Sequence, residues 1–217
     1  ATGLLDIVST AVPGIRDILV LGKIKQLERS GDADLIVLDA PAAGHAITFL
    51  RSASGLADAV KVGPINTQAA DVLELLTDPR RCRVVLVTIP EETPVNELIE
   101  TAYSLEDQVG VALGPVVVNG VVADLPGLAV TPQAAADEAG VRLLDGEADV
   151  LAAAAEFRHA REGLQQAQLD RMAAELPLPQ LHLPFLFTTD VGPDDIDLLA
   201  DALLSAITEL PEPEAGS

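Results

Sequence analysis

The sequence predicts an α/β fold in which helices flank a mainly parallel, doubly wound sheet. Short apolar runs that end at a proline or a glycine alternate with longer segments whose apolar residues recur at helical spacing. Hydrophobic residues make up 49% of the 217 residues and aromatic residues only 2%, so aliphatic side chains must build the core. Such runs are typical of parallel strands buried on both faces. We expect a single domain over residues 1–210 and a disordered tail over residues 211–217.

The first half of the chain predicts two strands, each followed by helical sequence. Helical spacing over residues 1–30 precedes an apolar run at residues 34–39, which predicts the first buried strand. A helical stretch over residues 46–76, with a Gly-Pro break inside it, follows. Residues 83–89 predict the second strand, and Thr93 is the expected N-cap of a helix that continues to about residue 109.

The second half of the chain continues this alternation. Residues 116–120 predict a third strand, and residues 147–175 predict a long helix rich in alanine and glutamine. Residues 180–186 predict a fourth strand, followed by a closing helix over residues 193–210 whose first turn is acidic. We interpret an apolar stripe on the long helix as core packing, with a dimer contact as the alternative. The stripe consists of Leu151, Ala155, Ala160, Leu164 and Leu169.

The charge and the cysteine content exclude several classes of protein. The net charge is −21, from 34 acidic and 13 basic side chains, so we expect no nucleic-acid partner. No apolar run approaches the roughly 18 residues of a membrane helix, and no signal peptide is recognisable. We therefore expect no integral membrane segment and a cytoplasmic location. The single cysteine, Cys82, excludes an intrachain disulfide and a Cys-x-x-Cys metal clamp.

Candidate site residues follow the first apolar run. Ligands of open α/β sheets bind at the carboxyl ends of the strands, and this run ends at Asp39. An aspartate there is typical of the Walker-B position, whose carboxylate faces the Mg²⁺ of a nucleotide, commonly through water. Gly44 would let a backbone N–H approach a γ-phosphate. The alternative is that Asp39 is an ordinary turn residue and that His45 has a cap-like role.

The segment from Asp39 to Leu50 resembles the switch II signature of the arsenite-pump and tail-anchored-protein-targeting ATPases. The family pattern is Asp-Thr-Ala-Pro-Thr-Gly-His-Thr-Leu-Arg-Leu-Leu. Pro41 stands one place earlier than the family proline, and Thr48 stands where the family has arginine. The matching positions are Asp39, Gly44, His45 and Leu50.

The resemblance continues along most of the chain, in the family's order. The matching segments are Pro13-Gly14-Ile15 with Asp17, Ile89-Pro90-Glu91, Val117-Val118-Asn119, the series Arg158, Arg161, Gln165 and Leu169, and Pro184-Phe185-Leu186 through Gly192. The resemblance implies a P-loop NTPase of the deviant Walker A type that uses ATP and Mg²⁺. In such a protein Asp39 would organise Mg²⁺, Gly44 would sense the γ-phosphate and His45 would shape switch II. Asn119 would read adenine, and the segment with Pro184 and Phe185 would close over the base.

The family's phosphate-binding loop is not in this sequence. No Gly-x4-Gly-Lys-[Ser/Thr] occurs, and the family's switch I aspartate is also missing. We therefore expect an incomplete, C-terminal portion that is inactive alone, exposes apolar edges, and hydrolyses ATP only within an intact parent. The alternatives are a non-catalytic regulatory or scaffold subunit that pairs with a P-loop-bearing partner, and a related partitioning or cofactor-assembly ATPase.

The resemblance also bears on partners. It implies a homodimer or a paralogous heterodimer that nucleotide closes, with a client that the sequence does not identify. The eukaryotic targeting members clamp their dimer with zinc through paired Cys-x-x-Cys motifs. Because Cys82 is the single cysteine, we expect no zinc.

Overall fold

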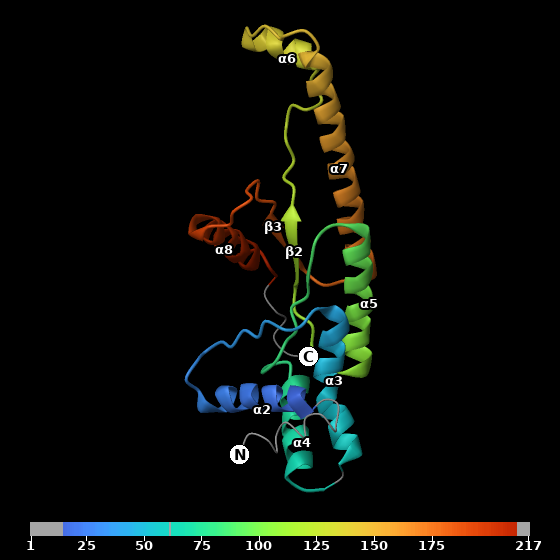
Figure 1. The fold of residues 1–217 in the computed structure, drawn as a ribbon, viewed down its shortest axis with the longest axis vertical. Coiled ribbons are helices and arrows are strands. Elements are labelled where there is room, and N and C mark those ends of the chain that lie inside the picture. Colours follow the sequence, from blue (N-terminus) through green and yellow to red (C-terminus); the bar gives the residue numbers. More distant parts are fainter. Residues whose placement is uncertain (1–14, 61, 212–217) are drawn as a thin grey trace. The chain divides into compact units, whose positions relative to one another are not determined.

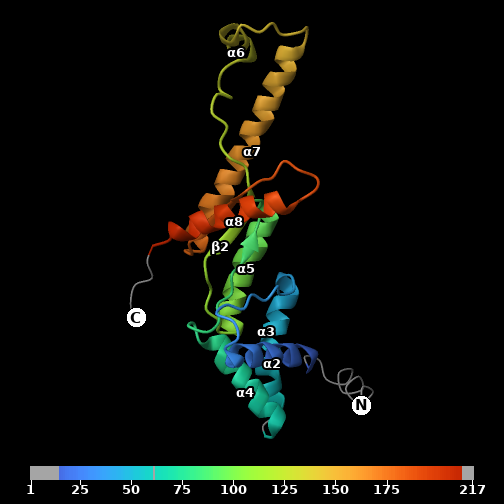
Figure 2. The ribbon, with the colours of Figure 1, turned by 90° about the vertical axis from the view of Figure 1, so that its left-hand side faces the viewer.

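The computed structural model describes residues 15–60 and 62–211 (Figures 1 and 2). The chain divides into two compact units. Unit 1 comprises Ala1–Leu86 and Glu97–Gly114, and unit 2 comprises Val87–Asn96 and Pro115–Ser217. The predictions for residues 1–14, including Pro13-Gly14, and for the tail from residue 212 lie outside the described residues. The single domain over residues 1–210 stays a prediction.

Unit 1 is built mainly from helices. Helix α2 spans Ile15–Ser30, α3 spans Ala43–Ala59 and α4 spans Pro64–Thr77. The Gly-Pro break thus separates two helices as expected, and Pro64 stands in the first turn of α4, where its missing N–H is tolerated. Aliphatic side chains and one phenylalanine form the core: Ile18, Leu21, Phe49, Leu50, Ala53, Leu56, Ala69, Val72, Leu76, Leu105, Val109 and Val111.

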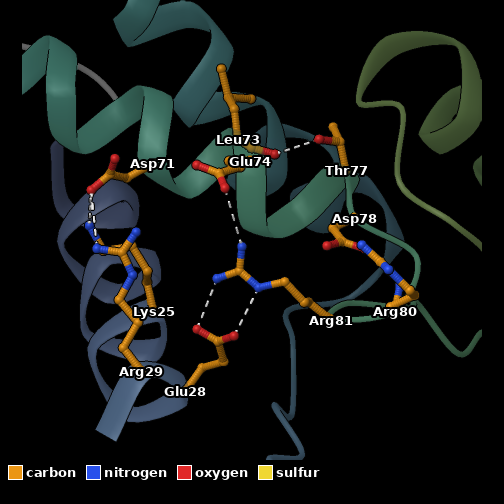
Figure 3. Close-up of polar contacts among 10 residues, drawn as sticks. All are labelled: Lys25, Glu28, Arg29, Asp71, Leu73, Glu74, Thr77, Asp78, Arg80 and Arg81. Carbon is orange, nitrogen blue, oxygen red and sulfur yellow. Dashed lines mark hydrogen bonds and ion pairs between the residues drawn. The ribbon is translucent and has the colours of Figure 1, made fainter.

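Ion pairs connect α2 to α4 and to the segment that follows α4 (Figure 3). Lys25 Nζ lies 2.8 Å from Asp71 Oδ2. Arg81 forms a bidentate pair with Glu28, with Nε–Oε1 and Nη2–Oε2 distances of 2.9 and 3.0 Å. A hydrogen bond from Arg81 lowers the pKa of the Glu28 carboxyl group below its usual value. These ion pairs therefore hold the charged face of α2 against α4 and the segment that follows α4, while the apolar face of α2 packs in the core.

The first predicted strand, residues 34–39, is not formed. These residues lie in an irregular segment between α2 and α3 and pair with no strand among the described residues. Leu35 is 79% and Val37 83% exposed, although an apolar run of this kind is normally buried. A strand needs a hydrogen-bonding neighbour, and no described segment forms a ladder with this one.

Unit 2 contains a parallel three-stranded sheet in the order β1–β2–β3. Strand β1 spans Val87–Thr88, β2 spans Val116–Val121 and β3 spans Gln180–Pro184. Val87 lies opposite Val117, and Val118 lies opposite His182. The α/β class and the parallel pairing are therefore confirmed, with three strands instead of four.

The second predicted strand is shorter than expected. Of residues 83–89, only Val87 and Thr88 join the sheet, while Val84 forms an isolated bridge with Leu113 inside unit 1. Pro90 follows closely and cannot donate a ladder hydrogen bond. The strand predicted at residues 180–186 also ends early, at Pro184.

The helices of unit 2 flank the sheet. Helix α7 spans Glu147–Glu175, as predicted, and α8 spans Pro193–Thr208; the sheet lies between these two helices (Figures 1 and 2). Helix α6, Pro132–Ala139, was not anticipated. Helix α5, Glu92–Gln108, begins in unit 2 and continues into unit 1. It starts at Glu92, so Thr93 lies inside its first turn and the N-cap prediction is wrong.

The apolar stripe predicted on the long helix is mostly outside the core. Leu169 is buried, as is Met172 one turn later, but Leu151 is 45% and Leu164 69% exposed. Only the last part of α7 therefore packs on the sheet through the expected residues. No helix among the described residues is long and apolar enough to cross a membrane.

Candidate functional site

The carboxyl ends of β2 and β3 carry an irregularity in their pairing. The register Val118↔His182 is followed by Val121↔Pro184, so two residues of β2 face one residue of β3. These two residues are Asn119, which is exposed, and Gly120, which has a φ of 69°. A bulge of this kind turns side chains away from the regular pleat, and glycine adopts its positive φ without strain. Asn119 therefore projects from the sheet edge at which ligands of parallel sheets bind.

Phe185 lies directly beside this bulge. Its backbone N–H donates to the Val121 carbonyl oxygen at 2.9 Å, and a Cβ on Gly120 would stand 3.7 Å from its ring. Phe187 packs against Phe185 edge to face, with ring centroids 4.9 Å apart and an interplanar angle of 68°. Both rings remain partly exposed, at 40% and 81%. The bulge and the two rings thus form a small aromatic surface at the end of the sheet.

Two arginines of α7 lie over these rings. The Arg161 guanidinium carbon is 6.0 Å from the Phe185 centroid, and that of Arg158 is 5.9 Å from the Phe187 centroid. Both distances are in the range of cation–π contacts. Arg158 is held by Glu162, whose Oε1 lies 2.6 Å from its Nε. Arg161 is paired in the same way, with its Nη2 3.8 Å from Glu91 Oε1, so each guanidinium group stands beside a carboxylate.

Gln165 connects the same helix to the end of β2. Its Oε1 accepts from the Val122 N–H at 2.8 Å, and its Nε2 donates to the Val122 carbonyl oxygen at 3.0 Å. Val122 is buried, so its backbone groups need partners inside the protein. This two-point contact fixes the chain three residues beyond Asn119. Gln165 therefore supports the site without facing it.

These residues together are called the aromatic–arginine site below: Asn119, Gly120, Arg158, Arg161, Pro184, Phe185 and Phe187. The Asn119 amide can donate and accept hydrogen bonds, while its Oδ1 accepts from the Gly120 N–H at 2.9 Å. Partly exposed rings offer a stacking surface, and the guanidinium groups, each paired with a glutamate, lie over these rings. This combination suits a planar heteroaromatic ligand that carries a hydrogen-bonding edge.

The other sequence-predicted residues lie in unit 1. Asp39 is exposed in the irregular segment before α3, and Gly44 and His45 occupy the first turn of that helix. The His45 N–H donates to the Ala42 carbonyl oxygen at 2.9 Å, and a Cβ on Gly44 would meet no atom within 4 Å. The structure thus brings Asn119, Pro184 and Phe185 together within unit 2, while Asp39, Gly44 and His45 belong to unit 1.

Sequence reasoning missed two features of the site. Phe187 was not singled out, although two of the four phenylalanines stand at positions 185 and 187 of a chain poor in aromatic residues. That local enrichment was a usable signal. Gln165 was matched to a family helix, but nothing in its sequence neighbourhood indicated a contact with Val122, which lies 43 positions away.

Comparisons with known proteins show which proteins the chain resembles. No protein-family model matches the chain. Over 200 residues the chain is 32% identical to a "Putative ATPase" of Mycobacterium bovis and to "ATPase BagA" of Mycobacterium tuberculosis. Each of these alignments covers 84% of this chain and 58% of the relative. It is 29% identical over 115 residues to a "Putative arsenical pump-driving ATPase" of Halobacterium salinarum, covering 49% of this chain and 18% of that protein. The match thus spans little more than half the length of the mycobacterial relatives. Relatives named in this way support an ATPase family for this chain.

Proposed function

We propose that this chain is the base-binding and switch II portion of a Mg²⁺-ATP-dependent ATPase that resembles the arsenite-pump and targeting ATPases. Its fold would then be the later part of a P-loop NTPase of the deviant Walker A type. The phosphate-binding loop would be supplied by a longer polypeptide, and hydrolysis would require it. The observation that carries the proposal is the grouping of Asn119 and Phe185 at the carboxyl ends of β2 and β3.

The aromatic–arginine site would hold the adenine. The Asn119 amide can satisfy both the donor and the acceptor of the N1/N6 edge of the base. Phe185 and Pro184 supply apolar surface on which the base stacks or packs. Arg161 stands over Phe185 and pairs with Glu91 at 3.8 Å, so it would help to hold the ring in place beside the base. The amide and the apolar surface together thus fit an adenine base better than a ligand without a hydrogen-bonding edge.

The residues of unit 1 would serve the phosphate end. Asp39 would organise Mg²⁺ through water, because a single carboxylate with waters and phosphate oxygens is a common Mg²⁺ environment. The open space around Gly44 is compatible with close approach of a phosphate to its backbone. His45, beside it in the first turn of α3, would shape the switch segment. Among the described residues no three His, Cys, Asp or Glu side chains are grouped as metal ligands.

A binding experiment tests the base site first. The chain would be titrated with ADP by isothermal calorimetry, because it contains no tryptophan for a fluorescence readout. Phe185→Ala should weaken binding by about 5- to 150-fold, the range for loss of one base–aromatic stack. Phe157→Ala is the matched control, since Phe157 is 71% exposed on α7 outside the site. Equal affinities of the two variants would refute the proposed base site.

A hydrolysis experiment separates the ATPase from the alternative. The chain alone should release no phosphate from ATP above the buffer rate, and a longer polypeptide that contains a P-loop should hydrolyse ATP. Asp39→Asn should abolish that turnover, because it removes the charge that organises Mg²⁺. Binding without turnover in the longer polypeptide would instead favour the non-catalytic subunit, which acts as a homodimer or paralogous heterodimer partner.

A further inference from the structure

Helix α7 has a second apolar face that no described element covers. Its sheet-facing side is defined by Gln165, Leu169 and Met172, of which the last two are buried. The other face carries large apolar side chains that stay exposed: Val150 at 69%, Phe157 at 71% and Leu164 at 69%. A globular helix normally buries its one apolar stripe, so a second stripe on the same helix requires its own explanation.

This second face follows a heptad repeat. Val150, Phe157 and Leu164 are spaced by seven residues and occupy the a positions. Three alanines occupy the d positions between and after them, and all six residues are exposed. These six, which we call the α7 seam, are Val150, Ala153, Phe157, Ala160, Leu164 and Ala167. Apolar a and d positions over consecutive heptads are typical of a helix that pairs with another helix. The seam ends where Arg171 occupies the next a position and donates to the Glu92 carbonyl oxygen.

The charges beside the seam indicate which helix fits it. In this heptad Asp149 and Glu156 occupy g positions, and Arg161 occupies the e position five residues after Glu156. In a parallel pair of identical helices, a g residue meets the e residue five positions later on the partner. Glu156 would therefore meet Arg161 of a second copy, as a second carboxylate beside a guanidinium group that already pairs with Glu91 of its own chain at 3.8 Å. In an antiparallel pair, g positions face g positions, so the acidic side chains at g would lie against those of the partner, which is unfavourable.

We propose that the α7 seam pairs in parallel with the same seam of a second copy of this chain, as a short two-stranded coiled coil. The small alanines at d let the two helices approach closely, and the bulky a residues fill the space between them. The net charge of −21 opposes association at low ionic strength, so the dimer strengthens as salt screens the two chains. The contact does not depend on nucleotide.

Cysteine cross-linking tests the contact and its direction. In a Cys82→Ser background, Ala153→Cys and Ala160→Cys would be oxidised separately and the covalent dimer measured on non-reducing gels. A parallel seam brings each d position close to its own copy, so both variants should cross-link. Ala173→Cys is the matched control, because Ala173 is an exposed alanine of the same helix outside the seam. Cross-linking of only one d variant, or of the control equally well, would overturn the parallel seam.

Sedimentation velocity tests the apolar contribution. The unmodified chain should dimerise at about 0.3 M NaCl, where the Debye length is about 6 Å and repulsion between the two acidic chains is largely screened. Phe157→Glu should weaken the dimer by at least about 30-fold, as expected for an apolar residue central to an interface. A helical circular-dichroism spectrum shows that a variant is still folded. Phe157→Ala removes the ring without adding a charge, so it should also weaken the dimer. A monomeric chain, whose seam then serves another partner, would refute the proposal, as would a dimer insensitive to both Phe157 variants.

Discussion

Replacing Gln165 by leucine should loosen the end of β2 and weaken unit 2. The substitution removes the two hydrogen bonds, of 2.8 and 3.0 Å, that Gln165 makes to the Val122 backbone. Each bond contributes about 0.5–1.5 kcal/mol net, so the free energy of unfolding should fall by about 1–3 kcal/mol. The loss should lie toward the upper end because Val122 is buried, and its N–H and C=O groups would be left without partners.

The assay combines urea unfolding with amide hydrogen exchange at Val122. Gln165→Leu should speed exchange of the Val122 amide by about 5- to 150-fold, the rate equivalent of that free-energy loss. Gln165→Glu retains the acceptor for the Val122 N–H and loses the donor to its carbonyl oxygen, so it should keep more amide protection than the leucine variant.

The neighbouring glutamine provides the control. Gln166 is exposed and its Nε2 bonds Asp170 on the same helix at 2.8 Å, so Gln166→Leu should change stability by less than about 0.5 kcal/mol. If Gln165→Leu and Gln166→Leu had the same effect, the two-point contact with Val122 would not stabilise this part of the fold.

Three further predictions concern unit 1. Leu105→Ala should lower the free energy of unfolding by about 2–5 kcal/mol, because Leu105 is 1% exposed in the core; Val62→Ala, at an 82% exposed position, should be nearly neutral in the same urea titration. Because the Arg81 hydrogen bond lowers the pKa of Glu28 below its usual 4.5, the pair stabilises the fold above that pH. Its contribution is lost as pH falls through the lowered, folded-state pKa. Glu28→Gln should therefore be less stable than the unmodified chain at neutral pH and converge with it in acid; a constant difference would contradict this. Gly44→Ala should raise stability by up to about 1 kcal/mol, since alanine favours helix and no atom lies within 4 Å, while lowering ATP turnover in a P-loop-containing polypeptide. A destabilised Gly44→Ala variant would show that the first turn of α3 is packed more tightly than described.

Elements with strong local signals were predicted well. The 29-residue helix α7 begins and ends at the predicted residues, and β2 differs from its prediction by one residue. Helix α6 was missed although its ends carry ordinary signals. Thr131 Oγ1 accepts from the Ala134 N–H, and Gly140 ends the helix with a φ of 66°. This segment was overlooked because its apolar content is low, not because its caps were absent.

The site was predictable only in part. Asn119, Pro184 and Phe185 were expected to act together, and the structure places them at the same sheet edge. The bulge that exposes Asn119 could not be predicted, because it depends on the register between β2 and β3, which are distant in the sequence. Whether Asp39, Gly44 and His45 join this site stays a prediction.

By itself the sequence determined the helical periodicity of most helices, α6 excepted, the identity of the β2 and β3 runs and most residue types of the candidate site, because these depend on local spacing and side-chain chemistry. The tertiary structure decided which apolar residues are buried. The run at residues 34–39 pairs with no described strand, and Val150, Phe157 and Leu164 of α7 remain exposed. Burial depends on what packs against a segment, and an apolar residue has the same sequence pattern whether its neighbour is the core, another copy or solvent.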